Sequence, residues 1–284
     1  MALPASGSIA LVANTGSGKG DADSVELWLR EAGAELLAFP HDRCEDAARS
    51  GAARMVVAGG DGSIAPAAHA AGSAGIPLAV IPVGTANDFA RAAGIPDDPR
   101  EATRLAAEGR RTRRIDLGWL GKRPFVNVAS AGLAPAAARR AAGLKGRLGS
   151  LAYLAGAVRA GVAARPVACA VGCEGRELFR GRAWQVTVGC SGAFGAGSSV
   201  GGSLDDGLLR AVAVPAGSRF RLLRMAYGLR RGTIADQDGV EAASCPVVEL
   251  DLPPGTELNV DGEVVRSGPV AARIDSAAFE LVVG

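Results

Sequence analysis

The first 110 residues alternate between short apolar runs and amphipathic stretches, and this alternation restricts the fold more than any other feature of the chain. Strands separated by helices must run in the same direction, which builds a parallel sheet with helices on both faces. The predicted strands are residues 8–13, 35–39, 55–58 and 77–81, and the predicted helices are residues 24–32, 43–50, 63–71, 87–93 and 99–108. The sequence therefore predicts an α/β domain in this part of the chain.

After residue 110 the pattern changes to short strands at hairpin spacing, which is typical of an antiparallel β-sandwich. Gly121-Lys122 is a hairpin turn signal. The predicted strands are residues 113–120, 125–130, 166–173, 177–179, 183–189, 208–214, 247–252, 257–260, 271–274 and 279–283, and the predicted helices are residues 136–142, 148–164 and 218–230. We expect an α/β domain over residues 1–112 and a β-sandwich-rich domain over residues 113–284, and the sequence leaves open whether the last strand returns to the first domain.

Composition excludes several classes of protein. A net charge of +2 on 284 residues does not favour nucleic-acid binding. The most apolar long run, residues 148–164, is interrupted by Arg159 and is short for a membrane span, and residues 1–8 lack the charged start of a signal peptide. The five scattered cysteines show no zinc-ligand spacing, which favours a reduced, cytosolic protein without a zinc site.

Three loops of the predicted α/β domain carry the residue types that bind phosphate and metal ions, namely residues 14–20, 59–63 and 84–88. Each follows a predicted strand, and loops that follow parallel strands emerge at the same, carboxyl, edge of the sheet. Glycine lets a ligand approach the backbone closely, and free N–H groups at a turn or helix start favour an anion. An aspartate there can hold a metal that neutralises the anion. Together the loops predict a phosphate and metal site.

Simpler structural explanations exist for the same residues. Asp61 is also what an ordinary Asp-Gly turn between a strand and a helix would contain. Thr85 or Asn87 could cap the helix that follows, and Asp88 in the first helical turn complements the helix dipole without any ligand. No single loop therefore decides between a binding site and a structural turn, and the argument depends on their convergence.

Two well-known glycine motifs are excluded by spacing. The Walker A pattern needs a glycine where the chain has Ala13 and a hydroxyl residue where it has Gly20. The dinucleotide-binding fingerprint needs a different spacing from that of Gly16, Gly18 and Gly20. The first loop is therefore neither a standard P-loop nor a standard dinucleotide loop.

Residues 59–63 (Gly-Gly-Asp-Gly-Ser) and 82–91 (Pro-Val-Gly-Thr-Ala-Asn-Asp-Phe-Ala-Arg), taken together, resemble the diacylglycerol-kinase catalytic-domain family. That family includes soluble bacterial lipid kinases and the sphingosine and ceramide kinases. Weaker matches follow in order at residues 14–19, 115–118, 125–132, 148–153, 206–209 and 261–263. The resemblance covers nearly the whole chain, and the first two motifs carry most of its specificity.

The resemblance implies a nucleotide-binding α/β domain and a β-sandwich with a cleft between them. It also implies transfer of the γ-phosphoryl group of ATP, with Mg²⁺, to a lipid hydroxyl, most simply that of diacylglycerol or a related lipid. The implied catalytic residues are Asp61, acting through water on Mg²⁺, and Glu263, the base for the acceptor hydroxyl. Nucleotide-binding residues would be Asn14, Ser17, Gly59, Gly60, Gly62, Ser63, Gly84, Thr85 and Asn87, and the metal residues would be Asp61, Asp88, Asp116 and Asp206.

The chain departs from the usual pattern of the family at several positions. Ser63 stands where threonine is usual, Thr15 stands where proline is usual, and Ala65-Pro66 replace an Asn-Glu pair. The loop over residues 189–202 also lacks the asparagine and proline expected before Asp206. The missing carboxylate beside Ala65 leaves the acceptor open.

Two alternative functions follow from these departures. NAD kinases and phosphofructokinases also contain a Gly-Gly-Asp-Gly turn, so one alternative is a kinase of the same fold with a non-lipid hydroxyl acceptor, NAD included. The other is a catalytically silent lipid- or nucleotide-binding module. Retention of Asp61, Asp88 and Glu263 argues against the silent module.

A lipid kinase has to reach a bilayer surface. Residues 218–231 form a basic amphipathic pattern that could lie on anionic lipid or, as a simpler alternative, pack on the sandwich. We expect a cytoplasmic protein that meets its lipid substrate peripherally at the inner face of the membrane and does not bind nucleic acid. A homodimer is left open.

Overall fold

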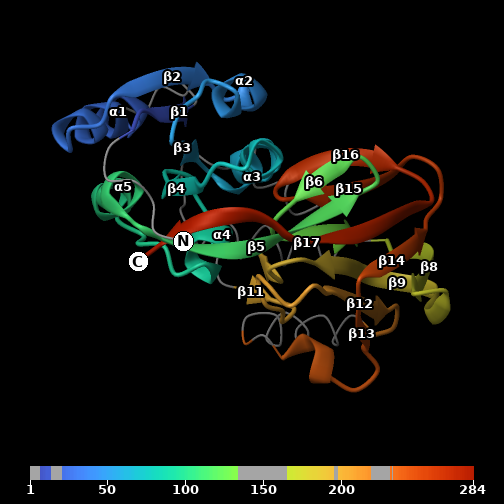
Figure 1. Ribbon diagram of the computed structural model, residues 1–284. Helices are drawn as coiled ribbons and strands as arrows, with labels where there is room; N and C mark the ends of the chain where they lie inside the picture. Colours follow the sequence, from blue (N-terminus) through green and yellow to red (C-terminus); the bar gives the residue numbers. More distant parts are fainter. Residues whose placement is uncertain (1–6, 14–20, 134–164, 195–197, 219–230, 232) are drawn as a thin grey trace. The chain divides into compact units, whose positions relative to one another are not determined.

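The computed structural model describes residues 7–13, 21–133, 165–194, 198–218, 231 and 233–284 (Figure 1). It divides into two compact units. The first unit comprises Met1–Leu117, Leu204–Gly207 and Asp275–Gly284, and the second comprises Gly118–Ser203 and Leu208–Ile274. The helices predicted over residues 136–142, 148–164 and 218–230 lie outside the described residues, except for Ser218.

The first unit contains a parallel sheet in the order β2-β1-β3-β4-β17 (Figure 1). Its strands are β1 (Ile9–Ala13), β2 (Leu36–Pro40), β3 (Arg54–Gly59), β4 (Leu78–Pro82) and β17 (Val270–Val283). Every residue of β1 and β4 is buried, as expected for strands that are covered on both faces. The predicted parallel α/β arrangement is confirmed.

Two pairs of helices cover the two faces of this sheet. The helices are α1 (Asp21–Glu31), α2 (Cys44–Ala48), α3 (Asp61–Ala74), α4 (Asp88–Ala92) and α5 (Pro99–Glu108). Helix α1 packs beside α5 on one face, and α2 packs beside α3 on the other (Figure 1). The bounds of α5 match the prediction, because Asp98 accepts hydrogen bonds from the N–H groups of Arg100 and Glu101 and so caps the helix.

Helix α3 begins earlier than the sequence predicted. We expected a start at Ser63 or Ile64 with Pro66 in the first turn, but the helix begins at Asp61, so Pro66 lies in its second turn. The first turn is closed by a hydrogen bond of 2.9 Å from the N–H of Ser63 to the carbonyl oxygen of Gly60. The glycines around Asp61, which we had assigned to the loop, therefore lie at the helix start itself.

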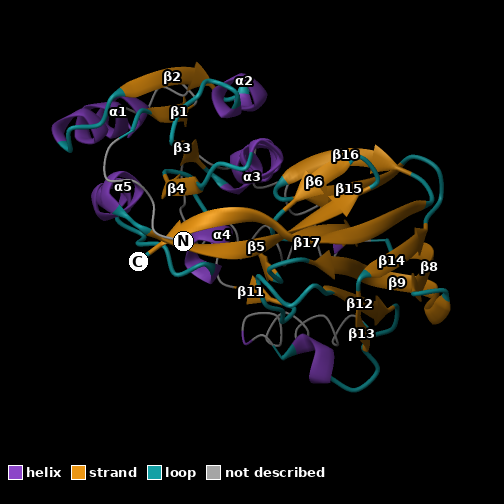
Figure 2. Cartoon of the chain, in the orientation of Figure 1, coloured by secondary structure: helices purple, strands orange, loops and turns teal. Residues whose placement is uncertain are grey.

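The residues of the second unit that the structure describes lie mostly in strands and the turns between them (Figure 2). Its strands are β5 (Arg111–Leu120), β6 (Arg123–Phe125), β7 (Val128–Gly132), β8 (Val167–Cys173), β9 (Arg176–Gly189), β10 (Ala193–Phe194), β11 (Ser198–Ser199), β12 (Leu209–Pro215), β13 (Glu241–Cys245), β14 (Val247–Asp251), β15 (Thr256–Val260), β16 (Glu263–Ser267) and the first part of β17, with a short 3₁₀ helix, η1, at Ile234–Asp236. Strand β5 starts in the first unit and ends in the second.

Strand β9 belongs to both layers of a β-sandwich. Its first half pairs with β8, and its second half pairs with β7 and β12. One layer therefore has the order β16-β15-β7-β9-β12-β13, and the other continues from β9 through β8 and β14 to β17. Residues of both layers, including Val171, Val188, Leu250 and Leu258, share one hydrophobic core. The predicted antiparallel sandwich is confirmed.

Several predicted strand limits were wrong. The strand predicted over residues 125–130 is interrupted at Val126 and Asn127, whose N–H groups bond a side chain instead of a neighbouring strand. The two strands predicted over residues 177–189 form one strand, β9, and those predicted over residues 271–283 form one strand, β17. Strands β10, β11, β13 and β16 were not predicted, because their short sequences lack a clear alternation of apolar and polar residues.

The two units do not divide at the predicted point. The predicted boundary between residues 112 and 113 falls inside β5, whose residues as far as Leu117 belong to the first unit. The question left open about the last strand is answered by β17, because its residues from Asp275 onward belong to the first unit and Leu281 pairs with Leu78 of β4.

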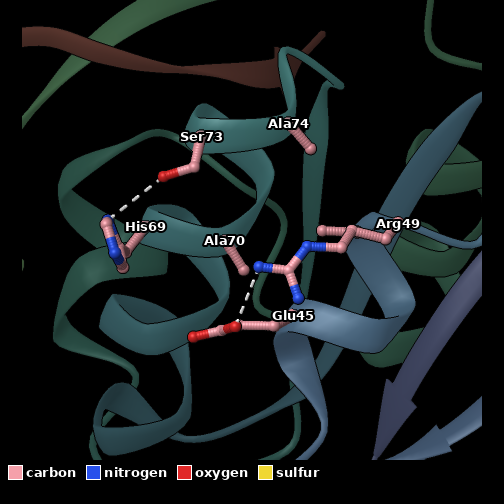
Figure 3. Close-up of a pocket in the computed structure, with 7 residues that line it drawn as sticks. Glu45, Arg49, His69, Ala70, Ser73 and Ala74 are labelled. Carbon is pink, nitrogen blue, oxygen red and sulfur yellow. Dashed lines mark hydrogen bonds and ion pairs between the residues drawn. The ribbon is translucent and has the colours of Figure 1, made fainter.

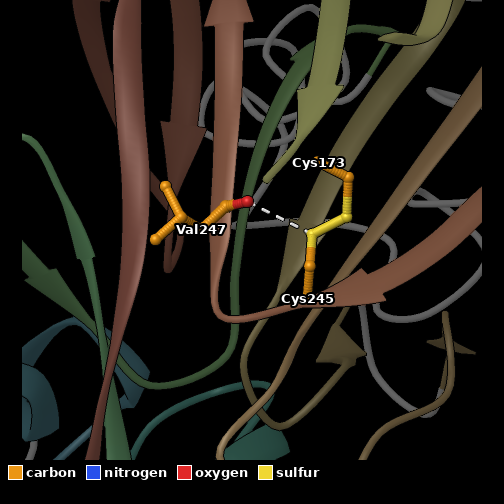
Figure 4. The surroundings of a disulfide bond; sticks show 3 residues. All are labelled: Cys173, Cys245 and Val247. Atoms are coloured by element: carbon orange, nitrogen blue, oxygen red, sulfur yellow. Dashed lines mark hydrogen bonds between the residues drawn. A yellow bond between two sulfur atoms is a disulfide. The ribbon is translucent and has the colours of Figure 1, made fainter. Parts of the chain in front are cut away.

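A disulfide joins the two layers of the sandwich. Cys173 at the end of β8 is bonded to Cys245 at the end of β13, with 6.0 Å between their Cα atoms (Figure 4). This pair corrects the expectation of a fully reduced protein. The two cysteines are 72 residues apart in the sequence, so their spacing gave no indication that they would meet. Cys44, Cys169 and Cys190 are buried outside this disulfide, and burial raises the pKa of the Cys44 and Cys169 thiols, which disfavours the reactive thiolate.

We predict that reduction of the disulfide lowers the stability of the protein. Closing a loop of 72 residues removes conformational freedom from the unfolded chain and is worth up to about 4 kcal/mol. Urea unfolding followed by tryptophan fluorescence should therefore show a lower midpoint in the presence of a thiol reductant. The Cys173→Ser/Cys245→Ser double variant should already have the lower midpoint and should not respond to reductant. A wild-type midpoint that stays constant while mass spectrometry shows both thiols free would contradict this prediction.

Candidate active site

Two glycine turns touch at the carboxyl ends of β3 and β4. Gly59 pairs with Pro82 at the end of the two strands, and the N–H of Val83 donates to the carbonyl oxygen of Gly59 at 3.2 Å. A Cβ atom on Gly84 would lie 2.5 Å from the Cα of Gly60, so no side chain fits between the turns. Packing therefore requires glycine at position 84, whereas a Cβ atom on Gly60 would lie 3.3 Å from the Cα of Gly84. With glycine at both positions, no side chain covers the backbone where the turns touch.

These turns lie near the position where an α/β sheet usually binds its ligand. Strand β1 lies between β2 and β3, so the chain leaves β1 toward one side of the sheet and later continues through β3 and β4 toward the other. Loops at such a reversal separate and form a crevice. Gly60 precedes the first turn of the 14-residue helix α3, whose first N–H groups have no partner within the helix and attract an anion. Asn14 and Ser17 of the loop after β1 lie outside the described residues.

Asp61 connects the starts of two helices. Its Oδ2 accepts a hydrogen bond of 3.2 Å from the N–H of Asp88, and its Oδ1 accepts one of 2.9 Å from the N–H of Phe89. These are the first two N–H groups of α4, which has no capping hydrogen bond from its own Asn87. A carboxylate at a helix N-terminus is favoured by the helix dipole. Asp61 therefore caps α4 from the first residue of α3.

The side chain of Asn87 shapes the second glycine turn. Its Oδ1 accepts from the N–H of Gly84 at 3.0 Å, and its Nδ2 donates to the carbonyl oxygen of Gly84 at 3.3 Å. Asn87 adopts a left-handed conformation with φ of 50°, which asparagine tolerates better than most residues. It thus holds the turn in place and does not cap the helix as the simpler sequence explanation expected. Thr85, between the two, is exposed.

Two other predicted residues support the same turns. Asp88 is only 5 % exposed and forms an ion pair of 3.2 Å with Arg91. Ser63 lies beneath the first turn, where a Cβ atom on Gly59 would come within 2.7 Å of its Oγ. The structure thus brings Gly59, Gly60, Asp61, Gly62, Ser63, Gly84, Thr85, Asn87 and Asp88 together at one edge of the first unit's sheet.

Asp116 lies at a second buried carboxylate site of the first unit. Its side chain is 3 % exposed and accepts hydrogen bonds from the N–H groups of Gly207 at 2.7 Å and Ala277 at 2.8 Å. Its own N–H donates to the carbonyl oxygen of Leu204 at 2.8 Å. Asp116 therefore holds together β5, residues 204–207 and β17. Ala277 has a φ of 53°, a strained value for alanine that these contacts maintain.

Asp206 and Asp116 line one open pocket of about 490 Å³ in the first unit. Arg113 on its wall forms an ion pair with Asp205, and this contact raises the pKa of the guanidinium. Within the described ranges, no three His, Cys, Asp or Glu side chains are grouped closely enough to hold a metal ion. The four predicted metal residues are thus arranged as two pairs, Asp61 with Asp88 and Asp116 with Asp206.

In the second unit, Asp261 accepts hydrogen bonds from three successive backbone N–H groups. Its Oδ2 lies 2.7 Å from the nitrogen of Val126, and its Oδ1 lies 3.0 Å and 2.9 Å from those of Asn127 and Val128. Asp261 is 9 % exposed and has a φ of 46°. The turn between β15 and β16 is thus fixed to the connection between β6 and β7.

Glu263, the predicted base, follows that turn as the first residue of β16. Its side chain is 58 % exposed and forms an ion pair with Arg123 of β6. The preceding Gly262 donates its N–H to the Oδ1 of Asn259 at 2.8 Å. The sequence did not single out Asp261 or Arg123 as residues with a role. The Asp-Gly turn gave a signal for Asp261, but nothing in the sequence indicated that Arg123 meets Glu263 across 140 residues.

A smaller pocket of about 240 Å³ lies between α2 and α3 (Figure 3). Glu45 and Arg49 on its wall form an ion pair of 3.0 Å, and Ser73 lies 3.5 Å from a ring nitrogen of His69. None of the predicted site residues lines it. It is therefore not a candidate for the active site.

Two families match the chain, one for each part. The family described as the diacylglycerol kinase catalytic domain matches residues 8–120. The family described as the YegS C-terminal NAD kinase beta sandwich-like domain matches residues 127–283. In the part of the chain that the structure describes, no helix combines the length and the hydropathy needed to cross a membrane.

Similar proteins agree with these matches. A Pseudomonas putida protein named "Probable lipid kinase YegS-like" is 32 % identical over 83 % of this chain and 79 % of its own length. A Mycobacterium tuberculosis protein named "Diacylglycerol kinase" is 27 % identical over 83 % of this chain and 78 % of its own length. A crystal structure of a diacylglycerol kinase from Bacillus anthracis has the same fold, with a TM-score of 0.78 and 21 % identity over 98 % of this chain and 97 % of that one.

We predict that Asp261→Ala destabilises the second unit strongly. The change leaves the N–H groups of Val126, Asn127 and Val128 without their acceptor, at a cost of about 1–3 kcal/mol for each buried group. Urea unfolding should therefore show a loss of about 3 kcal/mol or more. Glu241→Ala, at an exposed carboxylate of the same unit, is the control and should change stability by less than about 0.5 kcal/mol. Equal stability of the two variants would contradict the role given to Asp261.

Proposed function

The chain belongs to the diacylglycerol kinase catalytic-domain family, and on that premise we propose that it is an ATP-dependent lipid kinase. It would transfer the γ-phosphoryl group to a lipid hydroxyl, with diacylglycerol or a related lipid as the acceptor. The observation that carries the proposal is the pair of touching glycine turns with Asp61 between them. That arrangement is suited to a chain of phosphates and to the metal that accompanies it.

The residues present fit a nucleotide with Mg²⁺. A side chain on Gly84 would collide with Gly60, so the backbone is uncovered where the two turns touch, and the start of α3 supplies N–H groups for phosphate oxygens. Mg²⁺ prefers oxygen ligands and keeps several waters, so one or two carboxylates suffice. Asp61 and Asp88 supply such carboxylates. Mg²⁺, when bound, would neutralise charge on the phosphates during transfer.

The nucleotide contacts are divided among the three loops. Gly59, Gly60, Gly62 and Ser63 would bind phosphate oxygens, while Asn14, Ser17 and Thr85 would contact the nucleotide, with Gly84 and Asn87 shaping the turn. Asp61 accepts hydrogen bonds from α4 through both of its oxygens, and a carboxylate oxygen can accept more than one hydrogen bond, so these contacts are compatible with a further one from a metal-bound water. Asp61 would therefore act on the metal through a bound water. Its hydrogen bonds with α4 would hold its carboxylate in position for this contact. Asp88 would support the metal beside Asp61, while Asp116 and Asp206, which line one pocket, would support a metal at a separate position.

Glu263 would act as the general base. As the acceptor hydroxyl oxygen forms its bond to the γ-phosphorus, the bond from that phosphorus to the bridging oxygen of ADP breaks, and the hydroxyl proton moves to the Glu263 carboxylate. An exposed carboxylate can then release the proton to water. Such a base contributes roughly 10²–10⁴-fold to the rate.

The choice of a lipid acceptor rests on the names of the relatives and on the match with the kinase family. A lipid substrate would bring the protein to the cytoplasmic face of a membrane as a peripheral enzyme, with no nucleic-acid partner. A soluble acceptor such as NAD is the alternative, because the family matched by the second unit is described as NAD kinase-like. Ala65 and Pro66, where the family usually has Asn-Glu, keep this choice open to experiment.

We predict that the protein transfers label from [γ-³²P]ATP to a lipid that can be extracted into organic solvent. The assay would contain Mg²⁺ and vesicles with diacylglycerol or a sphingoid base, with NAD and fructose 6-phosphate as soluble acceptors. Glu263→Gln should reduce transfer by about 10²-fold or more because it removes the base. Asp61→Asn should abolish transfer, and circular dichroism must show that this variant still folds, since Asp61 also caps α4.

The remaining outcomes of this assay separate the alternatives. Label found only in NAD or in the sugar phosphate would refute the lipid proposal and support a soluble acceptor. Binding of ATP with no transfer to any acceptor would support a silent module. The Glu241→Gln variant changes an exposed carboxylate that is not among the candidate site residues, and it should transfer label as the wild type does.

A further inference from the structure

We propose that Arg123 is a positioning residue for Glu263, which it holds by one carboxylate oxygen so that the other can accept the proton of the acceptor hydroxyl. The inference rests on the proposed function, because it assumes that Glu263 is the base. None of the sequence motifs includes Arg123. It is the meeting of β6 and β16 in the folded second unit that brings the two side chains together.

The backbone that carries Glu263 is rigidly held. Asp261, two residues earlier, accepts three hydrogen bonds from residues 126–128 and donates its own N–H to the carbonyl oxygen of Val128 at 3.0 Å. Asp261 and Gly262 both have positive φ values, of 46° and 92°, which make a tight hairpin turn. The Cα of Glu263 is therefore fixed relative to the connection between β6 and β7.

The side chain of Glu263 is not fixed by the rigid backbone alone. It is more than half exposed, and a glutamate has three rotatable side-chain bonds, so a rigid backbone alone does not place its carboxylate. The ion pair with Arg123 supplies the missing restraint. Arg123 lies three residues before Val126, so the same short segment, residues 123–128, holds the backbone of the turn through Asp261 and the side chain of Glu263 through Arg123.

The two oxygens of Glu263 are in different situations. Arg123 donates from Nη2 to Oε2, while Oε1 has no hydrogen bond to any residue that the structure describes. A base that is oriented by a third group is a recurring arrangement in enzymes, because it presents one atom of the base in a defined direction. The planar guanidinium suits this role, since its donors have fixed directions.

Stability does not explain the contact. An exposed ion pair of this kind contributes little to the free energy of folding. Lys122, the neighbouring residue at the β5–β6 turn, is exposed and basic as well, yet no contact with a carboxylate is found for it among the described residues. The Lys122→Gln variant is therefore a matched control, because it removes the same charge one residue away from Arg123.

We predict that Arg123→Gln lowers kcat about tenfold and leaves the KM for ATP unchanged, because the carboxylate is misplaced while the nucleotide loops are untouched. Arg123→Lys should recover part of the loss, and Lys122→Gln should behave as the wild type. In a Glu263→Gln background, adding Arg123→Gln should cause no further loss, because the side chain that Arg123 positions no longer acts as a base. The measurement is label transfer to lipid vesicles, with thermal unfolding of each variant as the check on folding.

Failure of this inference differs from failure of the proposed function. If Glu263→Gln is inactive but Arg123→Gln stays within twofold of the wild type, the positioning role is wrong and the base assignment stands. If Glu263→Gln keeps full activity, the base assignment itself is wrong. If Lys122→Gln loses as much activity as Arg123→Gln, or if Arg123→Gln lowers activity equally in both backgrounds, the effect is one of general charge and the inference is overturned.

Discussion

The contact between the turns at Gly60 and Gly84 is the constraint on which the candidate site depends. Adjacent parallel strands place their outgoing loops side by side, and only residues without side chains let these loops approach to the observed distance. Asp61 can then reach the first N–H groups of α4, and Asn87 can close the second turn on itself. A larger residue at Gly84 would separate the turns and remove the cap of α4 at the same time.

Three aspartates of the family motifs share one structural role. Asp61, Asp116 and Asp261 each accept hydrogen bonds from backbone N–H groups that are distant in sequence, and two of the three side chains are almost fully buried. A carboxylate with two oxygens can satisfy several N–H groups at once. Loss of activity in a variant of any of these aspartates therefore has to be separated from loss of structure.

The sequence was informative where local periodicity and turn chemistry agree. Strands β1 to β4 and helix α5 lie where apolar runs, an Asp cap and glycines indicated, and the motifs at Gly59 and Gly84 identified the edge at which the candidate residues gather. It failed where a strand continues through polar residues, as in β9 and β17, or is interrupted by a distant side chain, as at Val126 and Asn127. Those limits are set by pairing partners far along the chain, which a local pattern does not contain.

By itself, the amino-acid sequence determined the class of the two units, the family and the set of motif residues, because these depend on residue type and short-range spacing. Tertiary structure alone decided that Asp61 caps α4, that Cys173 meets Cys245, and that Arg123 holds Glu263. Each of these contacts joins residues separated by tens of positions or more. Their geometry arises only when the strands have paired and the core has closed, since that packing, and not any local preference, brings the side chains within bonding distance.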